Sequence, residues 1–468
     1  MLCSLASKRS KLHQASLFMK KLILSGLLLL FSLTAQAQEV LTLEQCRSMA
    51  LEHNKQMTAA RRQTEASRYL LKSMKGNFFP NLSAYGTDVY ASMDGSLNIP
   101  GGNLPVFLPT LSPTTPAGFA YFPGIDLNLK VKNVLMAGIQ LEQPLYMGGK
   151  IRAGYRMAQA GSRVATLQEQ LTASEVIWET ENAYAQLVQA QELKKVAESY
   201  RALLEELLKV VESAQRHGLK PQNDVLKVRV KLNESELQVR KADHGCRLAT
   251  MNLCHWTGQP LSTSLTIEPT YPYVPQLEDH PQGDIMNRPE YGMLSQQVEV
   301  AREQVKLQRS EMLPQVGLRG SFDYTNGVKV NGQKLLNKPG FAVMLNVTLP
   351  LYHFGERHNK VKAAKMKLEQ AQLEQANLNE KMQLELTQAL HNLDEAQLEN
   401  EIADRSLEQA AENLRLSKDE YEAGMEILSD YLEAQTLWQQ AYATQVNARF
   451  ALYLQYVKFL KATGQLVR

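Results

Sequence analysis

The sequence is poor in cysteine, with four in 468 residues. Cys3 lies in the N-terminal leader, and Cys46, Cys246 and Cys254 are an odd set without the spacing of a disulfide framework. After the leader there is also no uninterrupted apolar run of about 18 residues, the length that a membrane-spanning helix needs. Size rather than disulfide bonds must therefore stabilise this fold, and any part that spans a membrane must be built from strands.

The first 37 residues have the features of a secretory signal peptide. Lys20 and Lys21 precede a short apolar run, Ala35 and Ala37 form a small-residue cleavage pattern, and Met19 is an alternative start. This leader carries five basic residues and no acidic one, which leaves 46 basic and 48 acidic residues in the mature chain. Such a balance gives no argument for a nucleic-acid partner, which would require a clustered basic face.

Glycine and proline are nearly missing from two long stretches. Residues 151–217 contain no proline and two glycines, and residues 356–423 contain neither. Each stretch predicts one helix on the order of 100 Å long. Apolar or small residues recur there at alternating steps of four and three: Leu193, Ala197, Tyr200, Leu204, Leu207, Val211 and Ala214, then Ala403, Leu407, Ala410, Leu414, Ser417 and Tyr421. This heptad spacing predicts left-handed coiled-coil packing.

Each long helix is predicted to end at a glycine and to turn back. The return helices are expected over residues 224–255 and 430–463, with Asn223 and Ser429 as N-caps. Each return helix is about half as long as its long partner, so a further helix in each half of the chain must fill the remaining length. The segments that supply it are Leu43–Gly76 and Asp284–Met312.

Between the short and the long helix of each half, the sequence changes to a period of two. Apolar and polar residues alternate over 315–325 and 340–349, and less regularly over 82–92 and 125–143. These four segments predict two β-hairpins, each with one apolar face. The segment Asp94–Gly124 lengthens the first hairpin, and its proline, glycine and aromatic content indicates an enlarged outer loop.

The two halves are copies of one unit. Pro-Leu-Tyr begins at residues 144 and 350, and Thr-Gly-Gln begins at residues 257 and 463, so corresponding positions lie 206 residues apart. We therefore expect two tandem repeats, residues 38–275 and 284–468, joined by a linker over 276–283. Each repeat is a long antiparallel helical hairpin plus a two-stranded β-hairpin, so the fold is mainly α with a membrane β part.

A strand of ten or more residues with one apolar face suits a membrane barrel, in which every backbone group must be paired. Four strands cannot close a barrel, because the smallest have about eight. The chain therefore either shares a barrel with copies of itself or folds its strands into an ordinary soluble sheet. Two copies would supply about eight strands and three about twelve, and three are favoured if the object is a conduit with a lumen.

Three paired motifs resemble those of the TolC-like outer-membrane efflux proteins: the Pro-Leu-Tyr-x-x-Gly segments, the Gly-x5-Asp-x-Leu helix tips and the Thr-Gly-Gln helix ends. The resemblance covers nearly the whole mature chain. It implies a homotrimer whose twelve-stranded barrel crosses the outer membrane of a Gram-negative bacterium and continues as an α-helical coiled-coil tunnel through the periplasm. It also implies an exit duct of a tripartite efflux or type I secretion system, with outer-membrane lipid, a periplasmic adaptor (membrane fusion) protein and an inner-membrane pump as partners.

The resemblance further implies a periplasmic gate formed by two carboxylates after the second tip glycine, Asp430 and Glu433. Three copies would place six carboxylates around a narrow opening, where they would favour cations and raise one another's pKa. Asp430 also fits a first-turn position that the helix dipole favours, and Glu433 also fits a solvated helix position. Both interpretations are compatible with these residues.

In the family an Asp of the first repeat is tied to a Tyr and an Arg of the second, and this lock holds the entrance shut. Asp224 and Tyr421 occupy the first two places, but the Arg position is Glu426. Either Arg216 or Lys220 replaces the missing cation, or the closed state depends on hydrogen bonds and packing. Tyr421 also fits an ordinary position in the heptad seam.

The tip segments Gly218-Leu219 and Gly424-Met425 resemble the places where family members contact the adaptor. An exposed apolar residue on a tight turn is suited to docking a helical partner. The same residues also fit an ordinary helix C-cap contact.

Catalytic and cofactor motifs are missing from the sequence. His244, Cys246, Cys254 and His255 match no zinc-site spacing, and there is no phosphate-binding loop or nucleophile elbow. We therefore expect no enzyme, no cofactor and no metal, with energy supplied by a partner. Two rival functions are a periplasmic adaptor, which has one helical hairpin and compact β domains, and a secreted enzyme or structural coiled coil with a small soluble sheet.

Overall fold

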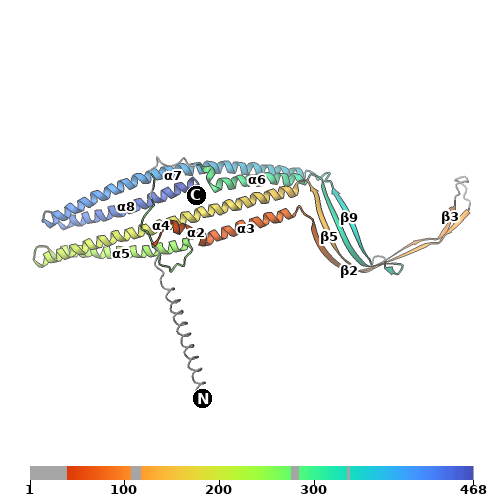
Figure 1. Ribbon diagram of the computed structural model, residues 1–468, viewed down its shortest axis with the longest axis horizontal. Coiled ribbons are helices and arrows are strands. Elements are labelled where there is room, and N and C mark those ends of the chain that lie inside the picture. Colours follow the sequence, from red (N-terminus) through yellow and green to blue (C-terminus); the bar gives the residue numbers. More distant parts are fainter. Residues whose placement is uncertain (1–39, 107–117, 273, 276–283, 335–337, 467–468) are drawn as a thin grey trace, which may run out of the picture. The chain divides into compact units, whose positions relative to one another are not determined.

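The computed structural model describes residues 40–106, 118–272, 274–275, 284–334 and 338–466 (Figure 1). The proposed signal peptide and the 276–283 linker lie outside these residues. Seven α-helices are described: α2 (Leu43–His53), α3 (Lys55–Gly76), α4 (Lys150–Arg216), α5 (Gln222–Thr257), α6 (Pro289–Ser310), α7 (Glu356–Glu422) and α8 (Leu428–Ala462), and a 3-10 turn η2 (Ile285–Asn287) precedes α6. None of the helices in these ranges combines the length and the hydrophobicity needed to cross a membrane.

Nine strands are described: β1 (Val40–Leu41), β2 (Asn81–Ile99), β3 (Gly102–Val106), β4 (Gly118–Phe122), β5 (Ile125–Met147), β6 (Thr266–Ile267), β7 (Gln315–Val330), β8 (Gln333–Lys334) and β9 (Pro339–Thr348). Their order along the chain confirms the predicted architecture, in which a short helix, a β-hairpin, a long helix and a return helix follow one another twice. The short parallel pair β1 and β6 belongs to the first repeat.

The chain divides into two compact units, and α4 and α7 contribute to both. The first unit consists of the described parts of residues 1–61, 168–291 and 379–468, which are almost entirely helical. The second consists of the described parts of 62–167 and 292–378, which hold the long strands together with α3, α6 and the adjoining halves of the two long helices.

The helical unit has two hydrophobic cores. One combines α2, the middle of α4 and the C-terminal parts of α5 and α8, with Tyr184, Leu187, Leu253 and Tyr453 almost completely buried. The other, which we call the tip cluster, joins both helical hairpins near their turns. Its buried members are Tyr200, Leu204, Leu207, Val211, Val225, Val228, Tyr421, Leu428, Tyr431 and Leu432. Several of these buried residues belong to the heptad pattern of the two long helices. The heptad positions are therefore packed against neighbouring helices, as their spacing predicts.

The helix expected over Leu43–Gly76 is interrupted at Asn54, which separates α2 from α3. Asn54 has an extended backbone and is buried, and its side-chain Nδ2 donates a hydrogen bond to the Trp256 carbonyl at 3.1 Å. Its Oδ1 accepts from the Gln56 backbone N–H at 2.8 Å. The Asn54 side chain therefore satisfies backbone N–H groups at the start of α3 and also ties the break to the neighbouring helix α5.

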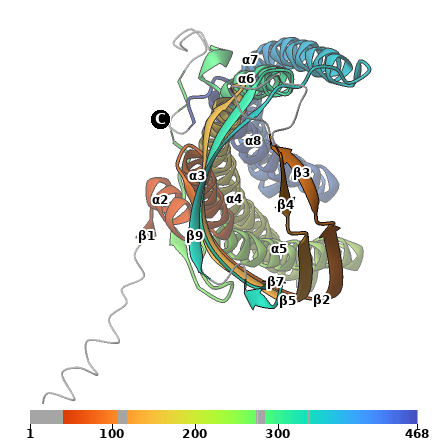
Figure 2. The same ribbon diagram turned by 90° about the vertical axis from the view of Figure 1, so that its right-hand side faces the viewer.

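The main sheet has the antiparallel strand order β2-β5-β7-β9, with the short β8 also on β7 (Figure 2). Figure 2 shows these strands bending together as one curved sheet. The outer loop expected over Asp94–Gly124 is wrong in part, because β2 and β5 stay paired as far as Ile99 opposite Ile125. Beyond them, β3 and β4 form a separate two-stranded ribbon.

Candidate functional site

Both helical hairpins turn at a glycine with a left-handed backbone, Gly218 and Gly424, each with φ of +74°. At the first tip the Leu219 N–H bonds to the Ala214 carbonyl, and at the second the Met425 N–H bonds to the Glu420 carbonyl, both at 2.9 Å. This is the Schellman arrangement, which satisfies the last carbonyls of a helix. Leu219 and Met425 follow the glycines and are 75% and 77% exposed, so the apolar tip residues point to solvent rather than into a cap contact.

The return helices begin earlier than the sequence predicts. Pro221 and Ile427 occupy the N-cap positions, and neither makes a side-chain cap hydrogen bond. Asn223 and Ser429, predicted as N-caps, therefore lie at the second helical position, and that prediction is wrong. Asp224 and Asp430 still lie in the first turn, where the helix dipole favours a carboxylate.

Tyr421 lies in the tip cluster, 6% exposed, and its ring stacks on Tyr431 with centroids 5.2 Å apart. The Lys220 ammonium lies 4.8 Å from the centre of the same ring. Burial raises the pKa of the Tyr421 hydroxyl, and the nearby Asp224 carboxylate raises it further. The structure thus brings Tyr421, Asp224 and Lys220 together, and it adds a stacked Tyr431 from the return helix, which lies outside the heptad pattern.

Glu426, which stands where the resemblance calls for an arginine, accepts a hydrogen bond from the Ser417 hydroxyl. Both residues belong to the second hairpin, so Glu426 stabilises its own tip. Among the described residues Asp224 forms no ion pair. Of the two cations that the sequence offers for this place, Arg216 and Lys220, Lys220 lies over the tyrosine ring.

Asp430 and Glu433 are both exposed on the first turns of α8. The Ser429 hydroxyl bonds to the Asp430 carboxylate at 3.2 Å. Glu433 lines a groove of about 580 Å³ between α5 and α8. The other lining residues are Asn223, Leu226, Lys227, Val230, Lys231, Ser429, Leu432 and Thr436. One groove near the tips therefore combines apolar side chains with two lysines and a carboxylate.

The main sheet has one apolar and one polar face. Register places six large apolar residues on the same face: Leu82, Ile139, Leu141, Phe322, Phe341 and Val343. All six are exposed. On the opposite face Glu142 pairs with Arg319, and the Tyr85 hydroxyl donates to Asp323 at 2.6 Å across Gly138. Transmembrane β-barrels have this pattern, with apolar side chains on the face toward lipid and polar side chains on the face toward the lumen.

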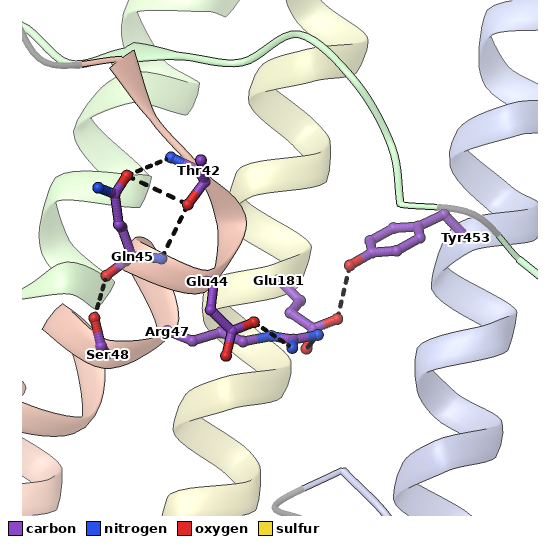
Figure 3. A network of polar contacts seen from close by, with 7 residues as sticks. All are labelled: Thr42, Glu44, Gln45, Arg47, Ser48, Glu181 and Tyr453. Atoms are coloured by element: carbon purple, nitrogen blue, oxygen red, sulfur yellow. Dashed lines mark hydrogen bonds and ion pairs between the residues drawn. The ribbon is translucent and has the colours of Figure 1, made fainter.

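A buried polar network lies inside the helical unit and joins three helices (Figure 3). Glu181 of α4 is completely buried, receives a hydrogen bond from the Tyr453 hydroxyl of α8 at 2.8 Å, and pairs with the Arg47 guanidinium of α2 at 2.6 Å. Burial raises the pKa of Glu181, and these two partners oppose that shift. The sequence predicts none of this, because the three residues are far apart in the chain and carry no local signal.

The model of the family described as outer membrane efflux protein matches residues 46–259 and 284–465. Among solved structures, the chain is similar to the Campylobacter jejuni CmeC outer membrane channel, with 19% identity, TM-score 0.71, and 90% of this chain and 85% of that one covered. It is also similar to the outer membrane protein VceC of Vibrio cholerae, with 16% identity, TM-score 0.69, and 90% and 96% covered.

A further similar structure is the open state of the Neisseria gonorrhoeae MtrE outer membrane channel, with 16% identity, TM-score 0.67, and 91% of this chain and 89% of that one covered. No curated protein sequence matches the chain. These identities are low, so the solved structures bear on the fold, whereas the family match covers both repeats.

Proposed function

The chain belongs to the outer membrane efflux protein family, and on that premise we propose that three copies assemble into one continuous passage from the periplasm to the exterior. It is an outer membrane channel that extends into the periplasm, and it is not an enzyme. This excludes both rival functions, the periplasmic adaptor and the structural coiled coil. In the proposed mature chain the signal peptide of residues 1–37 is removed, and the repeats 38–275 and 284–468 remain.

The observation that carries the proposal is the sheet with one exposed apolar face and two open edges. In hydrocarbon an unpaired backbone group costs several kcal/mol, roughly 2 to 7 by transfer measurements, so a four-stranded sheet cannot end inside a bilayer. Three copies supply twelve strands, which close around a lumen lined by the polar face. The alternating faces then place Leu141 and Phe322 against lipid and Ser321 and Asp323 in the lumen.

The partners fit the tips and the groove beside them. Leu219 and Met425 are exposed apolar residues on rigid turns, Gly218 and Gly424 fix those turns, and the groove between α5 and α8 is amphipathic. A periplasmic adaptor that presents helical hairpins would insert side chains there, in the helix-in-groove mode of recognition. The adaptor in turn recruits an inner-membrane pump, which supplies the energy.

Asp430 and Glu433 form the proposed gate. Both are exposed near the second tip, so three copies of each can face one another around the entrance. Six carboxylates at a constriction attract cations and repel anions. Replacing both residues by Asn and Gln is expected to lower the cation-to-anion permeability ratio in planar bilayers, whereas replacing Glu412 by Gln, on the exposed face of α7, should leave the ratio unchanged.

The proposed closed-state lock consists of Asp224, Tyr421 and Lys220. Tyr421 stacks on Tyr431 within a core shared by both hairpins, and Lys220 holds its charge over that ring. Opening would require the second hairpin to move away from the first, which exposes these rings and breaks the cation–π contact. Packing rather than an ion pair therefore keeps the tips closed.

The experiment that tests the proposed function combines crosslinking in intact cell envelopes with purification of the full-length chain. An adaptor and an inner-membrane pump should copurify, and the protein extracted from the outer membrane should migrate as a heat-resistant trimer. Recovery as a soluble periplasmic monomer would contradict the channel assembly. A trimer that copurifies with no pump or adaptor would leave the passage intact and contradict the partners.

A further inference from the structure

A cavity lies where the main sheet meets the helices, and it is separate from the groove between α5 and α8. Its volume is about 940 Å³, and we call it the junction cavity. The helical ends of β2, β5, β7 and β9 line it together with the end of α3, the start of α4 and Leu307 of α6. All of its lining residues belong to the second unit. Its size is that of a small-molecule site, for which volumes of roughly 300 to 1,000 Å³ are usual.

The floor of the junction cavity is the polar face of the sheet. Two adjacent cross-strand rows form it, and because they are two residues apart along each strand they lie on the same face. The first row, from β2 to β9, is Asn81, Glu142, Arg319 and Met344, and the second, nearer the helices, is Pro144, Gly317 and Asn346. In the proposed assembly this face lines the lumen, so the cavity opens into the passage and not toward lipid.

The helices contribute apolar side chains to the junction cavity. These are Met74 of α3, Ile151 of α4 and Leu307 of α6. The thioether of a methionine adapts to ligands of different shapes, and Met344 supplies a second one from the floor. A polar floor and apolar walls suit an amphipathic organic molecule better than a bare inorganic ion.

Two glycines keep the junction cavity open. Gly154 lies in α4 and Gly317 in β7, and neither has a positive φ, so the backbone does not require glycine there. A Cβ at Gly154 would find no described atom of another part of the chain within 4 Å, and one at Gly317 would find only the Gln143 carbonyl oxygen, at 3.9 Å. Glycine weakens helix and strand interiors. These two relieve no clash and leave empty volume in return.

The charges around the junction cavity favour an anion. Glu142 and Arg319 form an ion pair in the floor. Arg319 keeps further N–H donors, because a guanidinium carries five. Lys150 also lines the cavity, and within the described part of the chain it forms no ion pair. It is the first residue of α4, whose first turn holds no acidic residue, so the positive end of the helix dipole adds to its charge.

We propose that the junction cavity binds amphipathic organic anions on their way through the channel. Lys150, the start of α4 and Arg319 hold the anionic group, and the walls of Met74 and Leu307 cover the apolar body. The inference rests on the proposed function and deepens it, because it gives the passage a cargo-binding site with a chemical preference. The proposed gate is acidic and belongs to the first unit, so the two sites are different.

The test is isothermal titration calorimetry on the full-length protein in lipid nanodiscs, with empty nanodiscs as the blank. The probe is naphthalene-2-sulfonate, an anionic group on an apolar body. Naphthalen-2-ylmethylammonium is the matched probe, because it has the same ring system and the opposite charge. The sulfonate should bind saturably and at least about tenfold more tightly than the ammonium, since like charges in one site repel.

A volume variant tests the place of binding. Gly154→Leu fills the cavity and should weaken sulfonate binding by about tenfold or more. Gly161→Leu is the matched control, because it makes the same change two turns further along the same face of α4, where a Cβ also has open space. Gly161 does not line the cavity. Both changes replace a helical glycine by a better helix former, so neither is expected to prevent folding.

A charge variant tests the same site independently. Lys150→Gln removes one exposed cation and should weaken sulfonate binding by about twofold to fivefold. Arg152→Gln is the control, because Arg152 lies in the same first turn of α4 and is exposed but does not line the cavity. Its binding constant should equal that of the wild type.

Four results would overturn the inference: binding that Gly154→Leu leaves unchanged, equal weakening by Gly154→Leu and Gly161→Leu, equal weakening by the two charge variants, or tighter binding of the ammonium. A trimer that conducts ions in planar bilayers but binds no more sulfonate than empty nanodiscs would also overturn it, and would leave the proposed function intact. A monomer in native mass spectrometry would instead overturn the proposed assembly, and with it the place of the cavity in a lumen.

Discussion

The two units of this chain differ in where their hydrophobic residues lie: buried in the helical unit and exposed in the sheet unit. In the helical unit they lie in two cores built from five helices, and Leu187, Leu204 and Leu253 have almost no exposed surface. In the sheet unit Phe341 is 84% exposed and Val343 is 70% exposed, although both lie in a regular strand. The helical unit therefore covers its own core, whereas the sheet leaves an apolar face and two strand edges that its own chain does not cover. In the proposed assembly lipid covers that face and further copies cover the edges.

The largest effect is expected where the chain encloses its own core. Leu204→Ala should destabilise the tip cluster by roughly 3 kcal/mol, because it leaves a cavity among fully buried side chains. Leu219→Ala, the same change on an exposed residue near the tip, should cost less than about 0.5 kcal/mol. The apparent melting temperature of the purified trimer distinguishes them, and equal shifts would contradict the assigned burial.

The sheet should respond to which face is changed. Ile139→Arg puts a charge on the apolar face and is expected to cost about 2 to 3 kcal/mol if that face meets the middle of a bilayer. Gln140→Arg puts the same charge on the polar face and should be tolerated. The amount of trimer in the outer-membrane fraction is the readout, and equal losses in the two variants would contradict the assignment of the two faces.

A smaller effect is expected in the buried polar network. Tyr453→Phe removes one hydroxyl and leaves the Glu181 carboxylate without that donor, at a cost of about 2 kcal/mol. Tyr69→Phe, in which the hydroxyl lost is on an exposed residue, is the matched control. If both variants melt at the same temperature, the network does not join α2, α4 and α8 as described.

The smallest effect is expected at the proposed lock. Lys220→Met removes the cation over the Tyr421 ring, and such a contact is worth roughly 0.5 to 1 kcal/mol near a surface. Spontaneous openings in planar bilayers should become about twofold to fivefold more frequent, while Lys241→Met on exposed α5 should change nothing. If the frequency of openings is unchanged in both variants, Lys220 is not part of the lock.

The fold could be predicted where the sequence carries a periodic signal. The long helices follow from 68 residues without glycine or proline in the second repeat, and the strands near β7 and β9 follow from strict alternation. The extension of β2 to Ile99 could not be predicted, because cross-strand pairs such as Asp94 with Lys130 lie in a segment whose composition indicates a loop.

The candidate site was predictable only in part. Asp224 and Tyr421 could be assigned from matching motifs, but the contact of Lys220 with the Tyr421 ring depends on how one hairpin packs on the other. The break at Asn54 depends on its bond to the distant Trp256 carbonyl. Glu181, Arg47 and Tyr453 meet through tertiary packing alone, and no spacing along the chain encodes that.

The central claim is that one chain provides one third of a membrane wall that only other copies can close. The most direct measurement is an electron cryomicroscopy map of the full-length protein in lipid nanodiscs. The account predicts three copies around a lumen, with β9 of each adjoining β2 of the next and the face of Ile139 and Phe322 in lipid. A map in which the edges of the sheet are covered within a single copy, or in which that face lies away from lipid, would contradict it.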